Sequence, residues 1–144
     1  MPNLVIETGV KTFTINNDES RTITFSPTDY GFIKRLETAY EQLDAAQVKW
    51  AEAGKEATGD IHNLMDVIDG AEKEIRSLID YAFAAPVSEV VFHGLSAYAL
   101  AGGAPLWANF LLAVFDECDA EFTAQEKASN PRLQKLLKKY GKKK

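Results

Sequence analysis

The start of the chain alternates between apolar and polar positions, which predicts a β-hairpin. Phe13 and Ile15 alternate with threonines before the polar segment NDES, and Ile23 and Phe25 repeat the alternation after it. Successive side chains of a strand point to opposite faces of a sheet, so this pattern is typical of half-buried strands. We therefore expect a hairpin over residues 3–26, with NDES as its turn. Because two strands alone are marginally stable in water, a helix or another chain must cover their apolar face.

Two long segments then place apolar residues three and four positions apart, which predicts two amphipathic helices. The first is expected to begin near Thr28, which would cap it, and to continue to about Glu56. The second is expected to begin after a short break that contains Gly59 and to end near Ala82. A break this short favours an antiparallel helical hairpin. One or two further helical turns are expected over residues 86–92.

Residues 95–115 form the most apolar stretch and carry no charge. A membrane-spanning helix needs about 20 uninterrupted apolar residues. Gly102, Gly103 and Pro105 fall in the middle of this stretch, and Asn109 interrupts its second half. We therefore expect a connection of small residues followed by a new helix, and no membrane span.

The new helix is expected to run from Pro105 to about Ser129, with its first half enclosed by the other helices. Cys118 and Phe122 should lie on its buried side. Pro131 disfavours helical geometry at the residue before it, so RLQKLLKKY should form a separate short amphipathic helix. The apolar face of this last helix would be formed by Leu133, Leu136, Leu137 and Tyr140.

These elements predict a mainly α (α+β) fold of about four to five helices with an N-terminal β-hairpin. With 144 residues, of which 46% are hydrophobic, the chain has the usual size of one domain with its own core. We expect a single α-rich domain over residues 1–129, followed by a basic short helix and tail over residues 130–144.

The charge of the chain is divided unevenly. The net charge is -5, but after Lys127 there are seven basic residues and no acidic one, so residues 1–127 carry -12. A basic end can meet an acidic protein surface or a nucleic acid. We do not expect nucleic-acid binding, because the body is acidic and few aromatic residues accompany the lysines. The candidate partner-binding residues in this segment are Arg132, Lys135, Lys138 and Lys139.

Trp107 is a further candidate for partner binding. Tryptophan is enriched among the residues that dominate protein interfaces. At this position in an apolar helix, however, a role in the core is the competing interpretation.

No set of residues in the sequence predicts an enzyme, a cofactor or a metal site. His62 and His93 lie far apart without further ligands at zinc spacing, and the Gly102-Gly103 pair lacks the residues of a phosphate-binding loop. Acidic neighbours should raise the pKa of Cys118, which favours a buried structural thiol. With a single cysteine and no secretory signal, a reducing cytoplasm is the expected location.

Three stretches carry a resemblance to a known family. They are FSPTDYGFIKRLETAYEQLD, the segment YALAGGAPLWAN from Tyr98 to Asn109, and the Asn130-Pro131-Arg132 junction before the lysine-rich end. In these stretches the chain resembles tail assembly chaperone-like proteins encoded in tailed phages and prophages of Gram-positive bacteria. The resemblance extends over almost the whole sequence and includes no catalytic motif.

The resemblance implies a non-enzymatic role in building a long phage tail in the host bacterial cytoplasm. Proteins of this kind are thought to coat the tape measure protein, to help recruit tail tube subunits and to be absent from the mature virion. The chain itself suits self-association, because a hairpin edge can add strands and the acidic body and the basic end carry opposite charges. In many relatives a ribosomal frameshift produces a longer form, and the lysines at 142–144 are of the kind that a slippery adenine run encodes.

Two alternatives remain from other functional classes. A structural virion component, such as a head-tail connector or a tail completion protein, would bury the same hairpin and helices in a permanent ring. A nucleic-acid accessory protein would act through the basic tail, with an affinity that falls steeply as salt rises.

Overall fold

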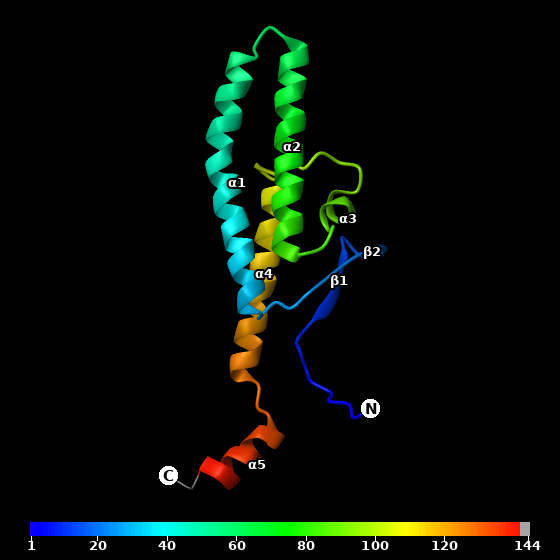
Figure 1. The fold of residues 1–144 in the computed structure, drawn as a ribbon, viewed down its shortest axis with the longest axis vertical. Coiled ribbons are helices and arrows are strands. Elements are labelled where there is room, and N and C mark those ends of the chain that lie inside the picture. The colour runs from blue at the N-terminus through cyan, green and yellow to red at the C-terminus, as the bar shows by residue number, and fades with distance from the viewer. Residues whose placement is uncertain (142–144) are drawn as a thin grey trace.

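The fold is mainly α with an N-terminal antiparallel β-hairpin, as predicted, and the molecule is elongated (Figure 1). The computed structural model describes residues 1–141, so the lysines at 142–144 and the prediction attached to them lie outside the described residues. The elements are β1 (Lys11–Ile15), β2 (Asp18–Phe25), α1 (Tyr30–Glu56), α2 (Ile61–Phe83), α3 (Ser88–Phe92), β3 (Leu100–Ala101), β4 (Ala104–Pro105), α4 (Leu106–Lys127) and α5 (Pro131–Tyr140).

The hairpin is shorter than predicted and turns earlier. Asn16 and Asn17 have φ of 51° and 63°, and asparagine tolerates this left-handed geometry better than most residues. The turn therefore lies at these two residues, and the predicted turn residues Asp18–Ser20 belong to β2 instead. Residues 1–10 form no strand, so the prediction that the hairpin starts near residue 3 is wrong.

Helices α1 and α2 form the predicted antiparallel helical hairpin (Figure 1). The N-cap of α1 is Asp29, whose carboxylate accepts a hydrogen bond from the Gly31 amide at 3.1 Å, and not Thr28 as predicted. Asp60 caps α2 in the same way. An aspartate oxygen reaches the free amides of a first turn and also interacts favourably with the positive end of the helix.

Five aromatic rings join the β-hairpin to the helices. Phe25 of β2 stacks on Phe13 of β1 and on Phe32 of α1, with ring centroids 4.5 and 5.0 Å apart. Phe83 of α2 packs edge-on against Phe25 and stacks at 5.5 Å on Phe110 of α4. Helices of the same chain therefore cover part of the hairpin's apolar face, which is one of the two possibilities the sequence left open, while Phe13 and Ile15 stay partly exposed.

The connection between α2 and α4 contains the predicted helical turns as α3, followed by a small hairpin. Strands β3 and β4 pair around Gly102 and Gly103, whose φ values of 62° and 82° favour glycine. Asn109 of α4 fixes this hairpin by donating from Nδ2 to the carbonyl oxygen of Ala101 at 2.8 Å. Within residues 1–141, every helix is too short or too polar to cross a membrane.

Helix α4 begins after Pro105 and ends at Lys127, two residues before the predicted Ser129. Its buried residues follow one face: Trp107, Leu111, Val114 and Cys118. The prediction that its first half is enclosed holds for that face only, because Leu112 is 56% exposed. The prediction that Phe122 is buried is wrong, since it is 40% exposed. Figure 1 shows the reason: the second half of α4 extends past the beginning of α1.

Helix α5 follows α4 as predicted and lies away from the body (Figure 1). Asn130 caps it by accepting from the Leu133 amide at 3.0 Å, and Pro131 occupies its first turn. No residue of α5 is buried.

Candidate partner-binding surfaces

Trp107, the first predicted binding residue, lies in the core. Its side chain is 1% exposed and packs near Tyr40, with ring centroids 6.5 Å apart. Its Nε1 has no hydrogen-bond partner among the described residues, so packing alone holds the ring in place. The structure therefore supports the core role for Trp107, the competing interpretation of the sequence.

The four basic candidates lie together on α5, far from Trp107 along α4. Arg132, Lys135, Lys138 and Lys139 are all exposed. The apolar residues of the same helix, namely Leu133, Leu136, Leu137 and Tyr140, are each about half exposed. Helix α5 thus presents both a basic and an apolar set of side chains to its surroundings.

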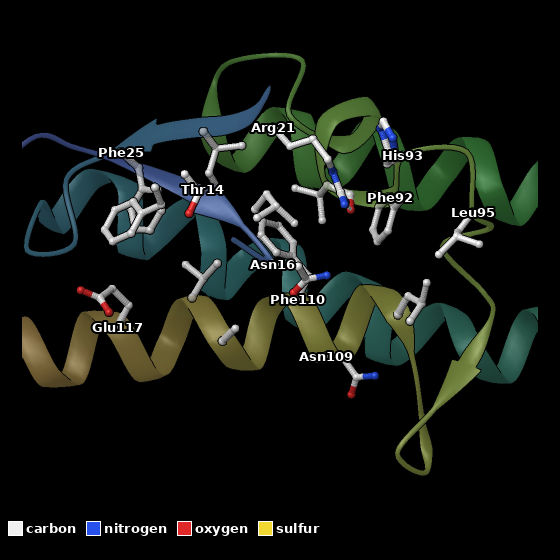
Figure 2. A pocket seen from close by; sticks show the side chains of 17 residues that line it. Thr14, Asn16, Arg21, Phe25, Phe92, His93, Leu95, Asn109, Phe110 and Glu117 are labelled. Carbon is white, nitrogen blue, oxygen red and sulfur yellow. Dashed lines mark hydrogen bonds between the residues drawn. The ribbon is translucent and has the colours of Figure 1, made fainter. Parts of the chain in front are cut away.

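An apolar groove that the sequence analysis did not predict lies between the β-hairpin, α3 and α4 (Figure 2). Its volume is about 460 Å³. We call it the hairpin groove, and define it by Phe13, Ile15 and Ile23 of the hairpin, Phe92 of α3, Leu95, and Leu106, Phe110 and Val114 of α4. The lining also includes six polar or charged residues: Thr14, Asn16, Arg21, His93, Asn109 and Glu117. A mostly apolar lining with some polar groups is typical of sites that receive an apolar group.

The sequence contains a partial signal for this groove. Leu106, Phe110 and Val114 recur every four positions, which places them on one face of α4. The same apolar positions also fit the prediction that other helices enclose the first half of α4. In the structure the hairpin stands against this face without closing over it, and the groove remains.

Arg21 fixes the hairpin to α3, at the side of the groove that α3 forms. Its Nε donates to the carbonyl oxygen of Val90 at 3.0 Å, and its Nη2 donates to that of Val91 at 2.6 Å. Both carbonyls belong to the last turn of α3, where helix carbonyls lack partners within the helix and a cation is favourable. The positive charge of Arg21 is therefore engaged in holding the fold.

Lys11 and Glu121 join the start of the hairpin to α4. Lys11 Nζ lies 2.7 Å from Glu121 Oε2. Hydrogen bonds from Lys11 and Gln125 lower the pKa of Glu121 below its ordinary value. The contact links β1 to the half of α4 that extends beyond the helical hairpin.

A second apolar groove lies along the distal half of the helical hairpin, between α1 and α2. It has a volume of about 570 Å³. We call it the arm groove, and define it by Gln47, Trp50 and Gly54 of α1, Leu64 and Ile68 of α2, and Tyr98. The first ten residues of α2 contain no buried side chain, since two helices alone cannot enclose an apolar face.

Glu72 holds the Tyr98 segment against α2, beside this groove. Its carboxylate accepts hydrogen bonds from Ser96 Oγ, from the Tyr98 amide at 3.1 Å and from Arg76 Nε at 3.1 Å. Burial alone would raise the pKa of Glu72, but these hydrogen bonds outweigh it and lower that pKa below its usual value. Tyr98 then packs edge-on against Trp50, with centroids 5.4 Å apart.

Cys118 is buried on α4 and is not arranged as a nucleophile. Burial, with Asp119 and Glu117 nearby, raises its pKa to about 11, so the thiol is protonated at neutral pH. Across residues 1–141, no three histidine, cysteine, aspartate or glutamate side chains are grouped so that they could hold a metal ion. The described surface thus offers two apolar grooves and a basic helix.

No protein-family model, curated protein or solved structure matches this chain.

Proposed function

We propose that this protein is a non-enzymatic tail assembly chaperone, which binds the tape measure protein and helps recruit tail tube subunits while a long phage tail is built. The proposal places it in the cytoplasm of the host bacterium and outside the mature virion. The observation that carries it is the hairpin groove, a mostly apolar groove with a volume of about 460 Å³ on a small acidic body.

The stretches that resemble the chaperone-like family border the described surfaces. Phe25, in the first stretch, and Leu106 and Asn109, in the second, line the hairpin groove. The third stretch, Asn130-Pro131-Arg132, forms the start of α5. Each of the three stretches thus contributes at least one residue to a candidate binding surface.

The hairpin groove suits a helical apolar client. An amphipathic helix binds a groove by inserting apolar side chains at positions three and four apart. Phe13 and Phe110, which are both partly exposed, supply aromatic surface for them. Each copy would cover a short stretch of a long tape measure protein, so many weak contacts would combine into stable coverage. The net charge of -5 would keep the coated complex soluble.

Co-expression with the tape measure protein and the tail tube protein of the same genome tests this proposal. We expect the tape measure protein to stay soluble in a complex that contains many copies of this chain, measured by size exclusion with light scattering. If the chain ignores both proteins and forms a closed ring alone, the role of a structural virion component replaces the chaperone role.

A further inference from the structure

Helix α5 has three leucines that residues 1–141 leave about half exposed. Leu133, Leu136 and Leu137 are 50%, 51% and 57% exposed, and the helix buries no residue. Isolated helices of ten residues are marginal in water, and tertiary packing normally supplies their stability. We therefore expect the apolar face of α5 to pack on another surface, which would stabilise the helix.

The arm groove has the dimensions of such a surface. Its α2 side extends from Leu64 to Ala71, and the exposed residues Ile61 and Met65 continue the apolar surface toward the tip. At 1.5 Å per residue, the eleven residues from Ile61 to Ala71 span roughly 16 Å, and the ten residues of α5 about 15 Å. A single helix laid along the arm would complete a three-helix bundle.

The charges of the two surfaces are opposite. The segment 44–74, which forms the distal half of α1 and α2, contains eight acidic residues and three lysines, a net charge of -5. Helix α5 carries Arg132, Lys135, Lys138 and Lys139 and no acidic residue. Opposite electrostatic potentials speed the association of the two surfaces and make it more specific.

A chain cannot place α5 in its own arm groove. The groove adjoins the start of α4, since the Trp107 amide donates to the carbonyl oxygen of Ala97, next to Tyr98. The 22 residues of α4 separate this point from α5 by roughly 33 Å. The three residues 128–130 span at most about 11 Å, and α5 folded back would add about 15 Å. Figure 1 shows the arm and α5 at opposite ends of the molecule.

We propose that α5 of one copy docks in the arm groove of a second copy, with its leucines on Leu64 and Ile68 and its basic side chains toward the acidic arm. The two surfaces differ, so the contact is heterologous and leaves one free groove and one free α5 at the ends of any chain of copies. The inference uses only this chain's own surfaces and does not depend on the proposed client.

Gly54 provides a variant that blocks the groove without disturbing the fold. It lines the arm groove inside α1, and a Cβ added there meets nothing within 4 Å. Gly54→Arg fills the groove, repels the basic helix and replaces glycine by a better helix former. Gly70→Arg is the matched control, because Gly70 is also helical with open space around it but does not line the groove.

Light scattering of the full chain over a range of concentrations at low salt tests the proposal. We expect the average mass of the unaltered protein and of Gly70→Arg to rise with concentration and to fall again at high salt. Gly54→Arg, and the double variant Leu133→Ser with Leu137→Ser, should each remain monomeric. Circular dichroism checks that each variant keeps its helical content.

A mixture of Gly54→Arg with the Leu133→Ser, Leu137→Ser double variant tests directly whether the contact is heterologous. One retains an intact α5 and the other an intact groove, so a heterologous contact predicts a 1:1 dimer that grows no further. A mixture that stays monomeric, or single variants that still associate, would overturn the proposal. So would an unaltered protein that stays monomeric at every concentration tested at low salt.

Discussion

At the scale of single residues, burial and neighbouring groups shift the pKa values of side chains that take part in the packing of this protein. The thiol of Cys118 illustrates this, because its pKa is raised from 9.0 to about 11 by burial and by acidic neighbours. The thiolate is the reactive form, and a difference of two pKa units leaves about 100 times less of it at pH 8. We expect Ellman's reagent to react about 100-fold more slowly with the native protein than with the protein in guanidinium. Equal rates would show that the thiol is accessible.

Glu72 gives a prediction about stability and pH. Its pKa in the folded state is lowered below the ordinary value of 4.5, so its carboxylate stabilises the fold above that pH and loses this effect as the pH falls through the folded pKa. Glu72→Ala removes the acceptor of three hydrogen bonds and should cost about 1–3 kcal/mol at pH 7.

Thermal melts of Glu72→Ala and the unaltered protein measure this effect. The gap in melting temperature should narrow between pH 5 and pH 3. Asp69→Ala, an exposed position on the same helix, serves as the control and should change little. A gap that stays constant over this pH range would mean that the charge of Glu72 does not carry the effect.

At the scale of elements, α5 is expected to contribute nothing to the stability of the body. None of its residues is buried, so ending the chain after Asn130 should change the free energy of unfolding by less than about 0.5 kcal/mol. Urea melts of the full and shortened chains at low concentration measure this. A loss of several kcal/mol would place α5 within the folded domain and contradict the division at residue 129.

The sequence predicted the elements better than their contacts, for a physical reason. Helix boundaries follow from local periodicity, caps and prolines, and α1, α2 and α5 begin and end close to the predicted residues. The burial of Phe122 and the position of the hairpin groove depend on where α1 begins and how the hairpin meets α4, which no local pattern encodes. The hairpin turn lies at Asn16 and Asn17 and not at NDES, because asparagine tolerates the left-handed geometry that this turn requires.

Some candidate binding residues could be predicted from local sequence, whereas the placement of others depends on tertiary packing. Arg132 and the lysines of α5 were predicted from composition, and they are exposed. Trp107 was weighed as binding or core from its residue type alone, and only tertiary packing places it in the core. The arm groove was also missed, because a regular apolar stripe such as that on Leu64 and Ile68 normally indicates burial.

At the scale of the whole molecule, two apolar surfaces serve separate purposes in our account. The arm groove and α5 join copies to one another, and the hairpin groove binds the client. A substitution in one groove should therefore leave the function of the other intact. Gly54→Arg should abolish self-association while a single copy still binds an apolar helix in the hairpin groove.

Leu95 and Leu112 allow the central claim, client binding in the hairpin groove, to be tested with a matched pair. They are 59% and 56% exposed, but Leu95 lines the hairpin groove and Leu112 does not. The measurement is the fraction of tape measure protein that stays soluble when co-expressed with Leu95→Asp, Leu112→Asp or the unaltered chain. We predict that Leu95→Asp loses most of the soluble tape measure protein and that Leu112→Asp retains it. Equal solubility with both variants would contradict the account.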